Sequence, residues 1–438
     1  MPHARALREP AAAVLRSDFP FAPSRLPVFY GWIILAVGTL GILMSLPGQT
    51  VGVSVFTDPL IAVTGLGRAG VSNAYLVGTL LSGLSLPWAG TLLDRWGART
   101  TAVAASLGLG ATLLFLSRLD RVFAIFSPPV PVGAAILVLG FFGLRLCGQG
   151  TLTMVGRTLI GRWFDRRRGL ASGLSGVVVG FGFGIAPQLL HLWVEAAGWQ
   201  GAWLQMAALV GLGMGSVALV FFRDDPESCG LRLDGNRTAA PGVEDRPAGR
   251  SHTRAEALRT AAFWTVTAAL GAQALVMTGV TFHVVDLGAE VGLSRSEAVF
   301  VFVPLAVVST ALGLVGGVLA DRISVRLMVG IMMVGLGAGL YGAADLSTRF
   351  GWAVAGFGTS AGLYGPIGTV AYPRLFGRRH LGAIVGAEMM ALVISSALGP
   401  SLLAASRETL GSYGPALAAC SILPVAVGAM AIRLRPKV

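Results

Sequence analysis

Apolar residues dominate the chain in blocks about as long as a membrane-spanning helix, and short polar breaks separate the blocks. A bilayer core of about 30 Å needs about 20 apolar residues in one helix. The pattern therefore predicts an all-α integral membrane protein with twelve transmembrane helices, in two groups of six. The predicted spans are 28–47, 70–89, 101–117, 132–157, 169–193 and 200–222, followed by 262–283, 297–319, 327–344, 350–372, 381–404 and 412–432.

The polar segments predict the domain organisation. The basic start of the chain has no apolar core followed by a small-residue cleavage site, so we interpret it as a cytoplasmic tail. The stretch between the two groups is rich in Arg, Asp, Glu, Pro and Gly, which is typical of a linker. The predicted parts are a tail (1–27), an N-terminal half (28–222), a cytoplasmic linker (223–260), a C-terminal half (261–433) and a second tail (434–438).

Composition narrows the class of protein. Of the 438 residues, 54% are hydrophobic and only 12% are charged, whereas a soluble domain carries about 25% charged residues. The three cysteines, Cys147, Cys229 and Cys420, show no spacing typical of a metal site or a disulfide framework. No phosphate-binding loop or catalytic cluster is evident, so we expect neither an enzyme, nor a cofactor, nor a metal site.

The net charge of +12 comes from arginines that lie between the apolar blocks. They are concentrated in alternate connections, and the positive-inside rule then places those connections and both termini in the cytoplasm. We therefore interpret the basic residues as topology signals and expect no nucleic acid as a partner.

The two halves repeat a short motif. Residues Gly90-Thr-Leu-Leu-Asp94-Arg95 recur as Gly317-Val-Leu-Ala-Asp321-Arg322, in the second cytoplasmic connection of each half. A second match links 162–167 to 374–379, after the fourth helix of each half. Two matches at corresponding loops indicate a duplicated six-helix unit, which is a common way to build a secondary transporter.

The segment 90–99, Gly-Thr-Leu-Leu-Asp-Arg-Trp-Gly-Ala-Arg, resembles the signature of the major facilitator superfamily between helices 2 and 3. The resemblance extends over about 30–435. It implies that the signature residues bias an alternating-access equilibrium, whereas the alternative is that Arg95 and Arg99 serve only as topology signals. The gating residues so implied are Gly90, Asp94, Arg95, Gly97, Arg99, Asp321, Arg322 and Arg326.

Within the superfamily the chain is similar to the monocarboxylate-transporter and oxalate/formate-antiporter branch. The similarity rests on Phe29-Tyr30-Gly31-Trp32, on the run 163–173, on Phe282-His283 and on Gly292-Leu293-Ser294. The predicted helix 297–319 departs from family members that bind carboxylates there, because it has no intramembrane Asp, Arg or Lys.

Arg145 is the sharpest candidate for a substrate ligand, because it lies near the middle of the fourth helix. A guanidinium can hold a carboxylate with two parallel hydrogen bonds. Two alternatives stay open. The segment resembles a helix 4 motif in which the Arg is credited with proton transfer, and Arg145 could also tie helices together through carbonyls or Glu388.

Three residues are candidates for proton coupling. Glu388 lies about two turns into the eleventh helix, where a carboxyl group in apolar surroundings can carry a proton; alternatively it pairs with a cytoplasmic Arg as a gate. His283 and Asp286 lie three apart, so they share one helix face. They could form an external proton site or an outer gate, or simply end a helix in water.

Uncharged polar side chains inside spans need partners, so they face a neighbouring helix or a cavity. The predicted substrate-binding set is Arg145, Gln149, Gln49, Gln273 and Tyr364. The sequence thus predicts a secondary transporter of a small organic anion, a monocarboxylate, by proton symport or anion exchange. The alternative is a proton-driven drug or metabolite exporter of the same superfamily. We expect a monomer surrounded by lipid in a bacterial inner membrane.

Overall fold

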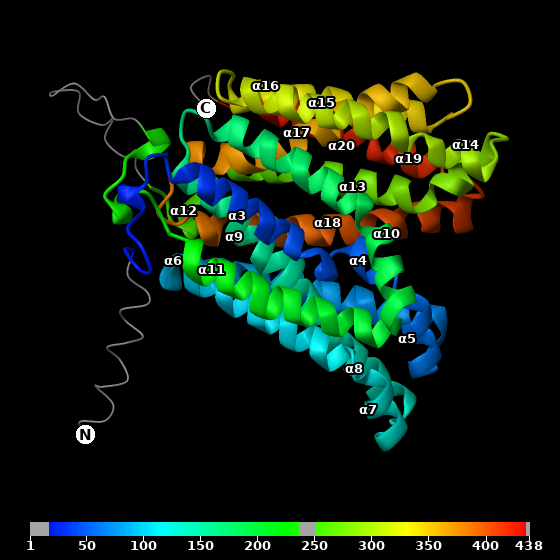
Figure 1. The fold of residues 1–438 in the computed structure, drawn as a ribbon. Helices are drawn as coiled ribbons and strands as arrows, with labels where there is room; N and C mark the ends of the chain where they lie inside the picture. The colour runs from blue at the N-terminus through cyan, green and yellow to red at the C-terminus, as the bar shows by residue number, and fades with distance from the viewer. Residues whose placement is uncertain (1–16, 236–250, 435–438) are drawn as a thin grey trace. The chain divides into compact units, whose positions relative to one another are not determined.

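The computed structural model describes residues 17–235 and 251–434, and this part of the chain forms helices and no strand (Figure 1). The predicted tails and linker therefore lie partly outside the described residues, at 1–16, 236–250 and 435–438. Their cytoplasmic location stays a prediction.

Eight helical stretches among the described residues are long and apolar enough to cross a membrane. Two of them, 67–116 and 168–221, each contain two predicted spans joined at a glycine. The shorter helix α3 (Gly31–Met44) and the less apolar helix α17 (Phe350–Phe376) supply the remaining spans. The fold thus has the twelve predicted spans.

The joining glycines explain why one helix turns directly into the next. In α6 (Gly67–Leu116), Gly97 has φ 82° and ψ 165°, and in α10 (Arg168–Ala208), Gly198 has φ 70° and ψ 168°. This region of backbone space is essentially restricted to glycine. A Cβ on Gly97 would also collide with the carboxylate of Asp224.

The chain divides into two compact units that broadly follow the two halves of the sequence. Each unit also incorporates a short segment from the other half, which is the beginning of α18 (Leu381–Leu410) in unit 1 and the beginning of α10 in unit 2. Unit 1 comprises Met1–Asp165, Val178–Gly249 and His380–Gly386; unit 2 comprises Arg166–Val177, Arg250–Arg379 and Ala387–Val438.

Unit 1 is built around α6. It packs against α8 (Val130–Gly143) and the π-helix η3 (Leu144–Leu152), and also against η4 (Leu209–Met214) and α11 (Gly215–Phe221). Helix α3 packs on α9 (Thr153–Trp163). Gly38 and Gly156 lie backbone to backbone there, as is common where membrane helices approach closely. The remaining helices of this unit are α4 (Thr50–Ser54), α5 (Thr57–Thr64) and α7 (Leu119–Phe126).

Unit 2 is built around α17. It packs against α15 (Phe302–Ala320) and α16 (Val325–Ala343), and α13 (Ala261–Glu290) contacts it as well. Capping boxes begin two short helices that precede longer ones: Thr253 with Glu256 for α12, and Ser294 with Glu297 for α14. The short helices of this unit are α12 (Arg254–Leu258), α14 (Arg295–Phe300), α19 (Gly414–Cys420) and α20 (Ile422–Ile432).

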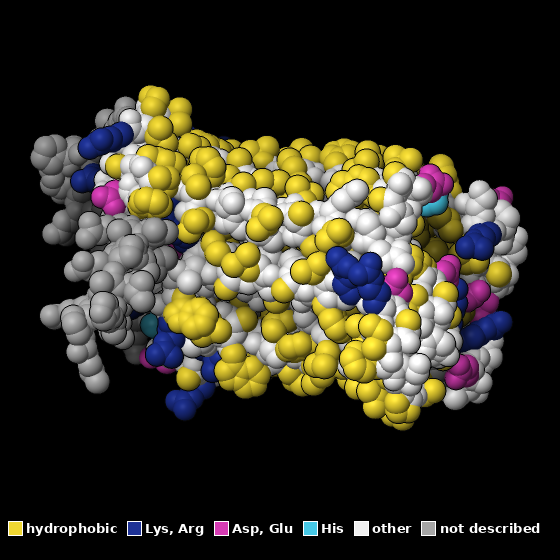
Figure 2. All heavy atoms as spheres, turned by 60° about the horizontal axis from the view of Figure 1, so that its bottom comes forward, with side chains coloured by type: hydrophobic (Ala, Val, Ile, Leu, Met, Phe, Trp, Pro, Cys, Tyr) yellow, Lys and Arg dark blue, Asp and Glu magenta, His cyan; other side chains and the backbone are white. Residues whose placement is uncertain are grey.

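Large apolar side chains remain exposed on both units, among them Trp88, Phe282 and Val425. Figure 2 shows hydrophobic side chains over the middle of the visible face, with most of the charged side chains near its ends. Lipid rather than water is the solvent that such a surface requires.

We predict that Gly97→Ala destabilises the protein by roughly 1–3 kcal/mol, because alanine is strained at this backbone conformation. The apparent melting temperature of purified protein measures the loss. Gly330→Ala is the matched control, since Gly330 lies in α16 and an added Cβ there would meet only open space. An equal melting temperature for the Gly97 variant and the wild type would contradict the proposed requirement for glycine at residue 97.

Candidate functional site

Arg145 lies on the π-helix η3, which interrupts the fourth span between α8 and α9. Wide helical turns of this kind are rare and frequently occur at functional sites. Glycines make the segment irregular and allow close contact: Gly148 lies against Gly48, and a Cβ on Gly48 would collide with the carbonyl oxygen of Leu144. The chain around residue 48 therefore lies directly against the π-helix.

The Arg145 side chain is 6% exposed. Its Nη1 donates a hydrogen bond to the carbonyl oxygen of Gly48 at 3.1 Å, and its guanidinium lies 5.4 Å from the centre of the Tyr75 ring. Its Nε has no hydrogen-bond partner, and no carboxylate forms an ion pair with it among the residues that the structure describes. A buried guanidinium in this position retains the capacity to bind an anion.

Polar side chains gather on the same side of the fourth span. Gln49 Nε2 donates to Ser45 Oγ at 2.9 Å and contacts Thr153 Oγ1 at 3.5 Å. Gln149, on the same π-helix, has a buried Oε1 with no hydrogen-bond partner, and its backbone N lies against Gly48. The structure thus brings together three predicted residues, Arg145, Gln49 and Gln149.

The sequence did not identify three further residues at this site: Tyr75, Thr50 and Thr153. The Tyr75 hydroxyl lies 2.9 Å from Thr50 Oγ1, and its ring lies beneath the guanidinium of Arg145. A single hydroxyl in an apolar block gives no periodic or charge signal, so only the fold reveals these contacts.

The other two predicted substrate ligands belong to unit 2. Gln273 Oε1 accepts a hydrogen bond from Ser360 Oγ at 2.7 Å, and both side chains are almost fully buried, so this pair ties α13 to α17. Tyr364 is half-buried on α17. A substrate role for either residue stays a prediction.

The proton-coupling candidates also lie in unit 2. Glu388 is 0% exposed on α18. His283 and Asp286 are near the end of α13, and the hydroxyl of Tyr413 lies 3.2 Å from His283 Nδ1 and 3.4 Å from Asp286 Oδ2. The structure brings His283 and Asp286 together through Tyr413, which the sequence placed in the predicted span 412–432 without identifying it as a site residue.

Asp94 is at the centre of a cluster in unit 1. One carboxylate oxygen accepts from Gly382 N and the other from Ala383 N, both at 2.8 Å, in the first turn of α18. Arg162 Nη2 donates to Asp94 Oδ1 at 2.6 Å, and both side chains are only 9% exposed. The carboxylate satisfies N–H groups that have no partner inside the helix and balances the positive helix end.

Asp321 makes the corresponding contacts in unit 2. Its two oxygens accept from Gly169 N at 2.7 Å and from Leu170 N at 3.1 Å, in the first turn of α10, and Arg374 Nη2 lies 4.0 Å away. Burial raises the pKa of the Asp321 carboxyl, and the two backbone donors and the Arg374 guanidinium oppose that shift. The sequence repeat is therefore also a repeat of contacts.

Glycines allow both carboxylates to reach the helix ends. A Cβ on Gly90 would collide with the carbonyl oxygen of Gly382, and one on Gly317 would collide with that of Gly169. Each glycine lies one turn before its aspartate, on the same helix face.

The signature arginines divide into two groups. Arg99 is 5% exposed, and it donates to the carbonyl oxygens of Phe222 and Phe19, each at 3.0 Å, so it holds the end of the sixth span. Arg95 and Arg322 are exposed, and Arg326 is half-exposed. Within 17–235 and 251–434 none of these three side chains makes a hydrogen bond or ion pair, so their gating role stays a prediction.

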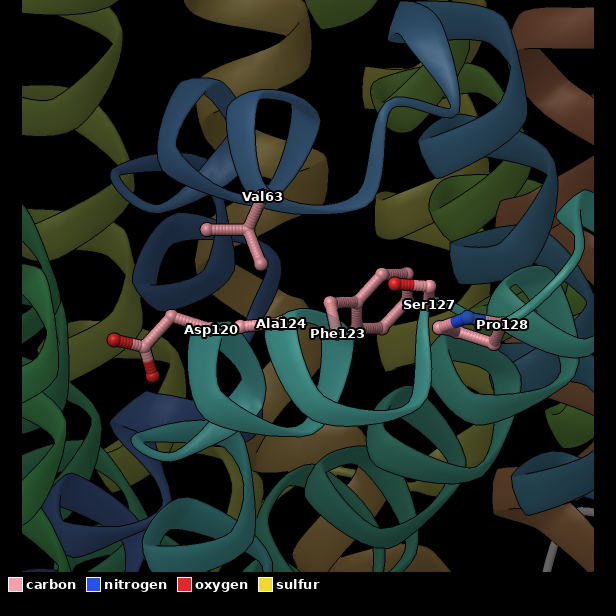
Figure 3. A pocket seen from close by; sticks show the side chains of 6 residues that line it. All are labelled: Val63, Asp120, Phe123, Ala124, Ser127 and Pro128. Carbon is pink, nitrogen blue, oxygen red and sulfur yellow. The ribbon is translucent and has the colours of Figure 1, made fainter.

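A separate hollow of about 440 Å³ lies between α5 and α7. Figure 3 shows Val63 from α5 facing the residues of α7, with the Asp120 side chain directed away from Phe123 and Ser127. None of the candidate residues lines this hollow. Within the described part of the chain, no cluster of His, Cys, Asp and Glu suited to a metal ion is present.

The fold and the repeated Gly–Asp contacts define a helical membrane transporter built from two related halves. The chain belongs to the Major Facilitator Superfamily, whose family model matches residues 33–400. This confirms the predicted fold class, with twelve transmembrane helices in two pseudo-symmetric halves, and it points to a transporter rather than an enzyme.

Two relatives and one solved structure place the chain further. It is 28% identical to monocarboxylate transporter 11 of Mus musculus over 360 residues, 76% of this chain and 72% of that one. It is 22% identical to the oxalate:formate antiporter of Oxalobacter formigenes over 235 residues, 53% of this chain and half of that one. The structure of the proton:xylose symporter XylE bound to 6-bromo-6-deoxy-D-glucose matches with a TM-score of 0.69 at 16% identity, covering 92% of this chain and 96% of that one. The two relatives confirm the branch that the sequence resembles.

We predict that Asp94→Asn destabilises the protein by about 1–3 kcal/mol, because the amide loses the ion pair with Arg162 and has one oxygen, not two, to accept from Gly382 N and Ala383 N. Thermal unfolding in detergent measures the effect. Arg95→Gln, at the neighbouring exposed position, is the control and should melt like the wild type. If both variants melt alike, the Asp94–Arg162 contact does not stabilise the protein.

Proposed function

We propose that this chain is a secondary transporter of a small organic anion, a monocarboxylate, and that Arg145 binds the carboxylate. The observation that carries the proposal is the buried guanidinium of Arg145, which has no carboxylate partner among the described residues. The relatives named for monocarboxylates, oxalate and formate support the same substrate class.

The energetics of burial favour an anionic ligand. Removing a charge from water costs several kcal/mol even after relaxation. One carbonyl bond from Gly48 and the face of the Tyr75 ring offset part of this cost. A bound carboxylate would offset more, because its two oxygens match the planar fork of a guanidinium.

The neighbouring polar groups suit a small polar ligand. The amide of Gln149 and the hydroxyls of Thr50 and Tyr75 supply both donors and acceptors near the guanidinium. A cationic substrate would instead face an uncompensated positive charge. The site therefore favours the anion carrier over the exporter of cationic drugs.

Coupling to protons is the second part of the proposal. Glu388 is fully buried on α18, where a carboxyl group can alternate between its protonated and ionised forms. The contacts of Asp94 and Asp321 with the beginnings of α18 and α10 would form in one state of the transport cycle and break in another. We place the protein in a bacterial inner membrane, with both termini in the cytoplasm, as the arginine distribution favours.

We predict that Arg145→Ala abolishes stabilisation by carboxylates. A ligand at 100 times its Kd stabilises the folded state by about 2.7 kcal/mol, and the variant should lose that shift. A thermal-shift screen of purified protein against small monocarboxylates and cationic amphiphiles, at pH 5.5 and 7.5, measures it. Arg118→Ala, an exposed arginine in the same unit, is the control.

Two results would contradict the anion proposal. In the first, a carboxylate stabilises the Arg145 variant as much as the wild type. In the second, only cationic or neutral amphiphiles stabilise the protein and the variant responds equally, which would support the proton-driven exporter.

We predict that Glu388→Gln abolishes uptake driven by a pH gradient while exchange of labelled for unlabelled substrate continues. The amide occupies the same volume but cannot release a proton. Flux into proteoliposomes with and without a pH gradient separates the two modes. Glu408→Gln, an exposed glutamate on the same helix, should behave like the wild type, and gradient-driven uptake by the Glu388 variant would disprove the assignment.

A further inference from the structure

Three titratable side chains form a hydrogen-bonded chain at the end of α13 in unit 2. The hydroxyl of Tyr413 lies between His283 Nδ1, at 3.2 Å, and Asp286 Oδ2, at 3.4 Å. Tyr413 is 2% exposed, and its ring centre lies 5.1 Å from that of the imidazole. The tyrosine belongs to the connection between α18 and α19. The hydrogen bonds of its hydroxyl therefore join that connection to α13.

The contact of the second ring nitrogen of His283 determines how many hydrogens are needed for all three side chains to be hydrogen-bonded. His283 Nε2 lies 3.0 Å from the carbonyl oxygen of Pro400 on α18. Because a carbonyl oxygen only accepts, Nε2 must carry a hydrogen. In the neutral imidazole Nδ1 is then only an acceptor, and because the phenol donates its single hydrogen to Asp286 Oδ2, no hydrogen is left for the contact with Nδ1.

One additional proton completes the chain. With His283 doubly protonated, Nδ1–H donates to the Tyr413 oxygen and the phenol donates to Asp286. With the proton on Asp286 instead, the carboxyl donates to the phenol and the phenol donates to Nδ1. In either arrangement both contacts of the buried Tyr413 hydroxyl are satisfied, whereas Asp286 is exposed and its carboxylate is also hydrated.

The two charged side chains beside His283, Tyr413 and Asp286 form an ion pair with each other. Glu290, one turn further along α13, accepts from Arg407 Nη1 at 2.8 Å and lies 3.3 Å from Tyr413 N. The Arg407 guanidinium, from α18, lies 5.9 Å from the centre of the Tyr413 ring. Glu290 and Arg407 neutralise each other, so the proton of the chain belongs to His283, Tyr413 and Asp286 together.

We propose that His283, Tyr413 and Asp286 form a binding site for a single proton, which fastens the connection between α18 and α19 to α13 when the proton is bound. Loss of the proton releases one of the two contacts of Tyr413. The site deepens the proton-coupling part of the proposed function and rests on that function only for its role in transport.

The test measures the apparent melting temperature of the full-length purified protein from pH 5.5 to 8.0. A folded state that holds one more proton than the unfolded state loses stability as the pH rises. Tyr413→Phe and His283→Gln should each remove this component, a change of about 2 °C or more across the range. Their double variant should match the single variants because the residues act as one unit.

Asp286→Asn separates a proton site from a merely structural contact. The amide can donate to the Tyr413 oxygen without an additional proton, so the chain is complete at every pH. The variant should melt at or above the wild-type temperature at pH 8.0 and lose the pH-dependent component. Tyr341→Phe and His191→Gln are controls, since both side chains are exposed.

The proposal is overturned if Tyr413→Phe keeps the wild-type pH profile, or if Asp286→Asn melts below the wild type at pH 8.0. Carboxylate-induced shifts at one fixed pH, measured on the same variants, test the anion site separately. A wild type that shows the pH component but no carboxylate shift would refute only the substrate assignment.

Discussion

The first turn of a helix exposes backbone N–H groups that no residue of the same helix can accept, and inside a membrane protein they must find another partner. At the beginning of α18 that partner is Asp94, which uses one oxygen for Gly382 and the other for Ala383. Arg162 balances the carboxylate, and Gly90 leaves room for the backbone to approach. Asp94, Arg162 and Gly90 therefore act together where unit 1 incorporates a segment from the second half of the sequence.

The sequence predicted much of this arrangement, because repeated residues at corresponding loops require a common physical reason. Gly90 and Asp94 recur as Gly317 and Asp321, and the second repeat pairs Arg162 with Arg374. The structure shows why both repeats exist, since each arginine lies beside the aspartate of its own unit. The sequence could not show that the two motifs meet, because hydrophobic periodicity carries no information on which loops are neighbours.

At the candidate anion site, the sequence identified individual residues but not the contacts between them. Arg145 stood out as a charge in an apolar span, and Gln49 and Gln149 stood out as amides that need partners. The π-helical turn has no signature in the hydrophobic periodicity. Tyr75 and Thr50 were hidden for the same reason. Composition and spacing therefore selected the candidate residues, whereas the shape of the candidate site depends on contacts between segments about 100 residues apart.

Helix α18 takes part both in the capping contact with Asp94 and in the contacts of the proposed proton-coupling residues. Its first turn is capped by Asp94 in unit 1, and its later part in unit 2 presents the Pro400 carbonyl to His283 and Arg407 to Glu290. The fully buried Glu388 lies between these points. In the proposed function, a change of protonation at His283 or Glu388 would act on a helix whose beginning is held by a carboxylate. The proposed coupling therefore depends on the continuity of α18 from Leu381 to Leu410, within which Pro400 lacks the N–H group that a helix uses for its backbone hydrogen bonds.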